Sequence, residues 1–285
     1  MIYLLLLSIV FASLNSVLLH KAKLSHRNIY LFNFLCAAVW CAVLFAANGF
    51  KLRMTQSVLV WGAVYGATQI LFMLFKTLAM NTGSVSVTTL VGNFSLVLSV
   101  VFCSIVWGET VSLSDVFGLM LLILGIILSA RKGTSGTSNS KWPVYLIFFL
   151  IFAAAVGISF KAFSKTGDTE YAGDMMITAA LVLLIGYGAL CLLHRKRNID
   201  GGRLLSKELV ALAVASGALS CVYNRLNVYL SGALSAVIFF PAFNGGVIML
   251  STVLSIVLLK EKLNFKTFVG ILLGIAGICV IGILN

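Results

Sequence analysis

The stretch that decides the fold is WGETVSLSDVFGLMLLILGI at residues 107–126, because a similar stretch, LKEKLNFKTFVGILLGIAGI, occupies residues 259–278. Both stretches carry a glutamate followed by two glycines at the same spacing, and every matched pair is separated by 152 residues. The matched pairs are Glu109 with Glu261, Gly118 with Gly270, and Gly125 with Gly277. A match of this length at one offset predicts an internal repeat that covers both halves of the chain.

The composition predicts that the chain lies in a membrane. Its 285 residues are 61% hydrophobic and only 10% charged, with a mean hydropathy of +1.10, whereas a soluble domain is about 25% charged. A spanning helix needs about 20 apolar residues. Apolar segments between short polar breaks predict an all-α integral membrane protein with ten transmembrane helices, at residues 2–19, 29–49, 57–78, 84–107, 115–130, 142–161, 173–193, 208–230, 233–259 and 266–284.

The predicted helices divide into two sets of five. The only Gly/Ser-rich segment, RKGTSGTSNSK, lies between the sets at residues 131–141, so we predict a first five-helix repeat at 1–130, a linker at 131–141 and a second repeat at 142–285. Because five is odd, the second repeat enters the membrane from the opposite face. The sequence therefore predicts two inverted repeats around a central cavity, an architecture common among secondary transporters.

A family resemblance rests on the repeated motif. A glutamate at the end of an apolar helix (WGET, LKEK) precedes a Gly-spaced helix (FGLMLLILGI, VGILLGIAGI), and this pattern resembles the drug/metabolite transporter superfamily, in particular its EamA-like ten-helix transporters. The turns NTGSVSV (81–87) and LSGALSAV (230–237) are also similar to that family. The resemblance covers most of the chain and is strongest over 77–130 and 229–282. It implies a 5+5 helix bundle with a central cavity and alternating access, and it leaves the substrate open.

The charges predict the orientation in the membrane. The formal net charge is +12, from 20 Lys+Arg against 8 Asp+Glu. In a membrane protein such basic residues set topology, so we expect no nucleic-acid partner. Loops after odd-numbered helices carry most of the basic residues and should be cytoplasmic, which places both termini outside a bacterial cytoplasmic membrane. The other side carries only Lys51, Arg53, Lys161, Lys165 and Arg225.

Motifs of catalysis are missing from the sequence. It contains no HExxH, no GxSxG and no glycine-rich phosphate loop, so we expect no enzyme activity, no catalytic residues and no cofactor. The six cysteines fall in apolar runs without metal-binding spacing, so we expect no metal site. All eight carboxylates lie at predicted helix ends or in loops, which favours facilitated diffusion or exchange over proton coupling through a buried acid. Glu109 and Glu261 should brace the turns that follow their helices.

Polar residues inside the apolar helices predict the substrate site. Lys76 and Arg225 are basic residues within predicted helices, where they either contact substrate or reach for the interface. The segment FFPAFNGG (239–246) places poor helix formers in a long apolar helix, so we expect that helix to bend at the site. The full set of expected substrate-binding residues is Asn15, Gln69, Lys76, Asn93, Tyr223, Arg225, Pro241 and Asn244.

These observations favour one function and leave two alternatives open. The favoured hypothesis is a secondary active or facilitative transporter or exchanger of a small organic metabolite, anionic or amino-acid-like because no deep acid balances the basic residues. The alternatives are a flippase for a lipid or lipid-linked substrate and a membrane scaffold that transports nothing. The expected partners are a small-molecule substrate and the lipid bilayer, with the chain as a monomer or homodimer.

Overall fold

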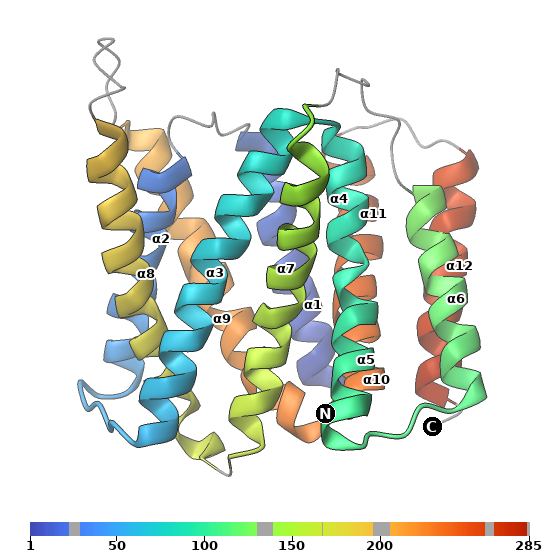
Figure 1. Cartoon of the computed structure of the whole chain (residues 1–285), viewed down its shortest axis with the longest axis horizontal. Helices are drawn as coiled ribbons and strands as arrows, with labels where there is room; N and C mark the ends of the chain where they lie inside the picture. Colours follow the sequence, from blue (N-terminus) through green and yellow to red (C-terminus); the bar gives the residue numbers. More distant parts are fainter. Residues whose placement is uncertain (23–28, 130–138, 167, 196–205, 260–264, 284–285) are drawn as a thin grey trace.

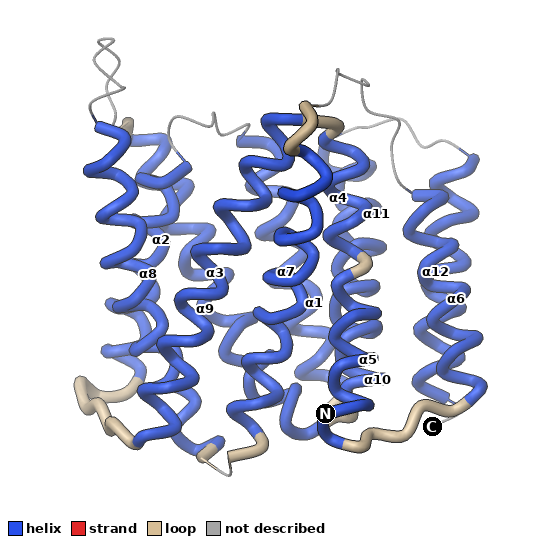
Figure 2. The backbone as a smooth tube through the Cα atoms, viewed as in Figure 1, coloured by secondary structure: helices blue, strands red, loops and turns tan. Residues whose placement is uncertain are grey.

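The computed structural model describes residues 1–22, 29–129, 139–166, 168–195, 206–259 and 265–283. Within these residues the regular structure is entirely helical (Figure 2). The first half forms α1 (Ile2–Ala22), α2 (Ile29–Ala47), α3 (Gln56–Thr82), α4 (Val85–Asn93), α5 (Ser95–Trp107) and α6 (Leu113–Ser129). The second half forms α7 (Trp142–Ser164), the 3₁₀ turn η2 (Thr169–Tyr171), α8 (Ala172–Arg195), α9 (Lys207–Ala233), α10 (Ala236–Phe240), the π-helical turn η3 (Pro241–Gly245), α11 (Gly246–Leu259) and α12 (Phe265–Ile283).

The predicted all-α membrane fold is confirmed. In the described residues, 9 helical segments are long and apolar enough to cross a membrane, and α6 adds a shorter apolar helix of 17 residues. Two of the spans are composite, because α4 with α5 and α10 with η3 and α11 each form one crossing. Most of the predicted linker at 131–141, and Glu261, lie outside the described residues.

The two composite spans are interrupted at matching positions. In the first half, α4 ends at Asn93 and α5 begins at Ser95. In the second half the interruption is the π-helical turn η3, which begins at Pro241 and contains Asn244. The Asn244 side chain donates a hydrogen bond from Nδ2 to the Phe240 carbonyl at 3.0 Å, which satisfies a backbone acceptor at the irregular turn. The segment FFPAFNGG thus forms a π-helical turn, an irregularity that is frequent at functional sites, whereas the first-half span is interrupted at Phe94 alone.

The glycine motif of the repeat joins the two halves. An ideal Cβ built on Gly125 would lie 2.6 Å from the carbonyl oxygen of Gly270, and one built on Gly277 would lie 2.6 Å from the carbonyl oxygen of Gly118. Only glycine allows the backbones of α6 and α12 to approach this closely, as in other small-residue membrane interfaces. The repeated stretch thus builds a helix pair with one member from each half, at one side of the molecule (Figure 1).

The two halves run in opposite directions. We call the face at which α1 begins and α12 ends the termini face; α7 begins at the opposite face (Figure 1). The packed pairs also correspond when the halves are exchanged, since α3 packs on α7 and α8 while α9 packs on α1 and α2. This arrangement is the one that an inverted repeat requires.

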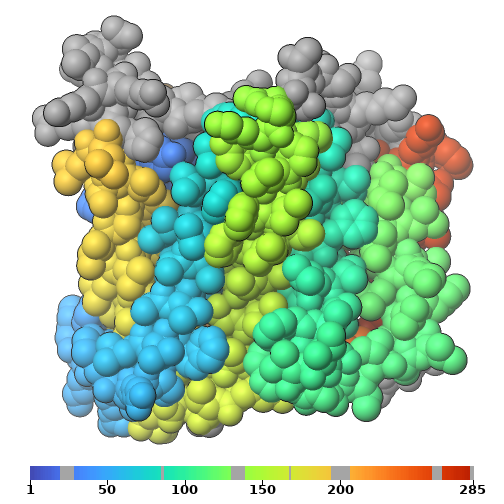
Figure 3. Space-filling model, in the orientation of Figure 1, coloured from blue at the N-terminus to red at the C-terminus, as the bar shows by residue number. Residues whose placement is uncertain are grey.

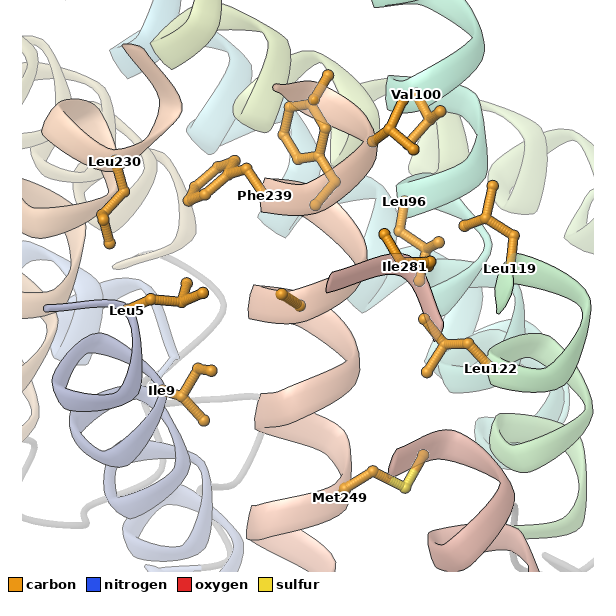
Figure 4. Close-up of a cluster of buried hydrophobic side chains, with 14 of the residues drawn as sticks. Leu5, Ile9, Leu96, Val100, Leu119, Leu122, Leu230, Phe239, Met249 and Ile281 are labelled. Atoms are coloured by element: carbon orange, nitrogen blue, oxygen red, sulfur yellow. The ribbon is translucent and has the colours of Figure 1, made fainter. Parts of the chain in front are cut away.

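The outer surface suits a lipid environment. Helices α8, α3, α7, α5 and α6 lie side by side on the face shown in Figure 3. Each of them exposes large apolar side chains, such as Ile185, Val60, Ile147, Ile105 and Phe117. Inside, one buried apolar cluster joins α1, α5, α6 and the α10–α12 segment, and it includes the residues labelled in Figure 4. The bundle therefore buries apolar contacts between its halves and exposes others to the bilayer.

Candidate functional site

A polar cavity lies between the two halves. Its volume is about 350 Å³, which is within the size range of small-molecule sites. The wall of the cavity is formed by the helices α3, α4, α5, α7 and α9, together with α10 and η3. None of the lining residues is acidic, and five carry a carboxamide: Gln69, Asn93, Asn224, Asn227 and Asn244.

The cavity contains one cation. Lys76 is half-buried in α3, and its Nζ lies 5.7 Å from the centre of the Phe72 ring, where the aromatic face attracts a cation. Glu109, which pairs with Lys161 and Lys165, lies at the other end of the cavity. Lys76 and Met80 lie in the C-terminal part of α3, which ends at the face opposite the termini (Figure 1). The cavity thus presents a positive charge without an acidic partner in its wall.

Hydrogen bonds to neighbouring helices and to the α9 backbone orient the carboxamide groups of α9. Asn227 Oδ1 accepts a bond from Ser8 Oγ of α1 at 2.7 Å, and Asn224 Nδ2 donates to the Ser220 carbonyl at 2.8 Å. Tyr65 Oη donates to Asn224 Oδ1 at 3.4 Å and accepts a bond from Gln69 Nε2 at 2.9 Å. These bonds connect α1, α3 and α9, so the orientation of the polar wall depends on both halves.

A buried ion pair lies at the end of the cavity nearest the termini face. Phe160 lines the cavity, and the next residue, Lys161, places Nζ 2.8 Å from Glu109 Oε1 and donates to the Leu234 carbonyl at 2.6 Å. Glu109 Oε2 accepts a bond from the backbone N–H of Ala236 at 2.5 Å. The side chains of Lys161 and Glu109 are only 3% and 12% exposed. We call these four groups the closing cluster.

The closing cluster joins elements from both halves. Glu109 follows α5, whereas Lys161 belongs to α7, and Leu234 and Ala236 connect α9 to α10. Although burial raises the pKa of Glu109, the hydrogen bonds from Lys161 and Ala236 lower it below the ordinary value of a glutamate. The prediction that Glu109 braces the turn after its own helix is wrong, because its carboxylate contacts Lys161 of α7 and the backbone N–H of Ala236 at the start of α10. Lys161, which the sequence analysis counted among the basic residues of this side of the membrane, is buried because α7 continues past it to Ser164.

Comparison with known proteins agrees with this architecture. The model of the EamA-like transporter family matches residues 1–131, which contain α1 to α6. This match covers slightly less than half of the chain. The resemblance to the drug/metabolite transporters that the repeated motif indicated is therefore confirmed.

Two further relatives extend beyond this EamA-like half. An uncharacterized protein of Haemophilus influenzae is 25% identical over 192 residues, which is 65% of this chain and 62% of the relative. This chain therefore spans less than two thirds of that relative's length. A solved crystal structure matches 99% of this chain and 96% of its own with a TM-score of 0.70 and 18% identity, which shows that the whole chain shares its fold.

Five of the eight expected site residues lie at the cavity. Gln69, Lys76, Asn93, Tyr223 and Asn244 all line it. The sequence analysis did not select Asn224 and Asn227, although they lie on either side of Arg225 in one polar segment of α9. Their buried positions and their spacing with Ser220 and Ser231 on one helix face were the available signal.

Three expected residues lie outside the cavity wall. Arg225 is exposed, and its guanidinium lies against Gly173 at the start of α8. One residue is about 100° of helix rotation, so the neighbour of the cavity residue Asn224 is turned away from it. Asn15 accepts a hydrogen bond from Ser216 Oγ at 2.7 Å between α1 and α9. Pro241 is buried in η3 and shapes the turn that carries Phe243 and Asn244 into the wall.

Proposed function

We propose that this membrane protein is a secondary transporter of a small organic metabolite that carries a carboxylate or another anionic group. The observation that supports the proposal is the cavity of about 350 Å³ with Lys76 as its cation, five carboxamides and no acidic residue in its wall. A cationic substrate would find no countercharge there, whereas an anion would pair with Lys76 in a site shielded from water.

We infer that substrate moves by alternating access between inverted repeats. The opposite directions of the halves and the exchangeable helix pairs support this inference. The cavity extends from the closing cluster towards Lys76 and Met80, so this arrangement is closed at the termini face. With the basic loops in the cytoplasm, it corresponds to an inward-facing state of a protein in a bacterial cytoplasmic membrane. Opening to the other side then requires the Glu109–Lys161 contact to break.

The absence of an acid from the cavity wall favours facilitated diffusion or exchange. Proton-coupled transporters usually place an ionisable carboxyl group along the substrate pathway. In this chain Glu109 lies at the closed end and already has a cationic partner. We therefore expect substrate gradients, rather than a proton gradient, to drive transport.

A ligand-stabilisation screen of the purified protein identifies the substrate class. A ligand that binds only the folded state raises the apparent melting temperature by mass action. We expect organic carboxylates to stabilise the protein more than amines of similar size. A panel in which only amines or neutral compounds stabilise the protein would contradict the proposed anion site.

Proteoliposome uptake of the stabilising compound then tests transport itself. We expect the compound to accumulate by exchange for the same compound inside the vesicles, with or without a proton gradient. Movement of a labelled lipid between leaflets, without uptake of the compound, would show a flippase instead. Binding without movement of either molecule would indicate a scaffold.

A further inference from the structure

A second hollow lies on the lipid side of the second half. This α1–α12 groove has a volume of about 690 Å³ and lies between α1, α12 and the α10–η3–α11 span. Every lining residue is aliphatic, methionine, cysteine or glycine, and they include Leu6, Ile238, Met249, Ile275, Cys279 and Ile281. The groove has no polar side chain for water or a metabolite, so its occupant must be apolar.

The groove opens to the bilayer. Leu6 is 53% exposed and Ile275 is 46% exposed, and both belong to its wall. Deeper in the groove, Leu5 and Ile9 project from α1 towards the α10–α11 span (Figure 4). The groove therefore has a mouth in the lipid phase and a floor formed by helix side chains.

The groove wall on α12 is about as long as one leaflet is thick. On α12 its wall extends from Ile271 to Gly282, which is ~16 Å along the axis at 1.5 Å per residue. Half of the hydrocarbon core of a bilayer is about 15 Å thick. The wall begins at the termini face, where α1 starts and α12 ends, and on the α10–η3–α11 span it extends from Ile238 to Val253, which is ~22 Å and passes the middle of the hydrocarbon core. A chain anchored in the headgroups of that leaflet would follow it from end to end.

The volume of the groove fits a lipid acyl chain better than a transmembrane helix. A helix of ~10 Å diameter occupies about 120 Å³ per residue, so 690 Å³ holds roughly six helical residues. A spanning helix of a second copy needs about 20 residues and would fit only beside the groove. A single flexible hydrocarbon chain can fill both its length and its width.

We propose that the α1–α12 groove binds one acyl chain of a membrane lipid from the leaflet at the termini face. The groove floor includes Ala242 of η3 and Gly246, whereas Phe243 and Asn244 line the polar cavity on the other side of the same turn. The bound chain thus supports the outer side of the irregular turn. The proposal rests on the groove alone and stands whether or not the polar cavity transports an anion.

Photolabelling in proteoliposomes tests the site. The probe is phosphatidylcholine with a diazirine in the middle of one acyl chain, and peptide mapping locates the labelled residues. We expect label on groove residues such as Ile275 and Cys279 to exceed label on other lipid-facing residues of α12 several-fold. Uniform labelling of all lipid-facing helices would show ordinary boundary lipid and overturn the proposal.

Two tryptophan substitutions provide a matched pair. Ile275 lines the groove and is 46% exposed, whereas Leu272 is 52% exposed on the same helix and lies outside the groove. Ile275→Trp should reduce the labelling of Cys279 several-fold, and Leu272→Trp should leave it unchanged. Equal labelling in both variants would contradict the proposal.

One further variant tests whether reduced labelling comes from misfolding. One cross-linking measurement tests whether a second copy of the protein fills the groove. Gly282→Phe also fills the groove, and an ideal Cβ at Gly282 meets nothing within 4 Å, so it should reduce labelling without disturbing packing. Cys279 is exposed and can report on a neighbouring copy. Oxidative Cys279–Cys279 cross-linking of the wild type in vesicles, together with weak lipid labelling, would assign the groove to a second copy and overturn the proposal.

Discussion

The two ends of the polar cavity each place a lysine in a different environment. At the termini face, Lys161 is paired with Glu109 and bonded to the Leu234 carbonyl. Towards the opposite face, Lys76 lies over the Phe72 ring in a wall without an acid. A paired buried charge holds two halves together, whereas an unpaired one needs a mobile counterion. We therefore propose different roles for the two lysines, with Lys161 closing one end of the cavity and Lys76 binding substrate at the other.

Removing the cation of the closing cluster should have the largest effect. Lys161→Met leaves Glu109 in a largely buried site, and loss of one partner from a buried ion pair costs about 3–5 kcal/mol. The closed arrangement should lose much of this stabilisation. Cys103, which is fully buried near Glu109, should then react with a membrane-impermeant maleimide added at the termini face. The measurement uses a chain in which the other five cysteines are replaced by alanine.

Lys165→Met is the matched control for this substitution. Lys165 Nζ lies 3.7 Å from the same Glu109 oxygen, but its side chain is 47% exposed. Exposed ion pairs contribute only about 0–1 kcal/mol, so Cys103 should stay protected. If Cys103 is equally protected in both variants, the Glu109–Lys161 contact does not close this end.

Acidification should destabilise the closing cluster by a smaller amount than Lys161→Met does. Because the pKa of Glu109 is lowered in the closed arrangement, its contact contributes full stability above the ordinary carboxyl pKa of about 4.3. This stability is lost as the pH falls through the lowered value. Hydrogen exchange of the Ala236 amide, corrected for the intrinsic effect of pH, should therefore rise at low pH in the wild type. Glu109→Gln does not titrate, so a similar rise in that variant would contradict the assignment.

The irregular turn should affect transport more than binding. Pro241→Ala restores a backbone N–H and favours regular α-helix, which would change how η3 carries Phe243 and Asn244 into the wall. We expect the transport rate to fall several-fold while ligand affinity changes little. Pro143→Ala is the control, because this other proline lies in the first turn of α7, where proline is tolerated. Equal transport rates in the two variants would show that the η3 turn has no role in transport.

The sequence predicted the pairing of the halves better than it predicted the site. The matched spacing of Gly125 and Gly277 predicted an internal repeat, and the structure adds that these glycines lie where α6 and α12 meet. Lys76 also stood out as a basic residue on a polar helix face, and it lines the cavity. Patterns within one helix were sufficient for these conclusions because periodicity fixes which residues share a face.

The remaining site features depend on contacts between distant segments. Lys161 has neighbours from the end of α5 and the α9–α10 connection, so no local pattern shows that it is buried. Arg225 misled the sequence analysis for the opposite reason. Its depth in α9 suggested the cavity, whereas the rotation of the helix turns it towards α8 and leaves Asn224 in the wall.

The most direct test compares a carboxylate ligand from the screen with its neutral amide. Hydrogen bonds to charged groups contribute about 1.5–3 kcal/mol, so the wild type should bind the carboxylate roughly 10- to 100-fold more tightly. Lys76→Gln should abolish this preference, and Arg225→Gln, which changes a cation outside the cavity, should keep it. A wild type that binds the amide equally well, or a Lys76→Gln variant that keeps the preference, would contradict the anion site.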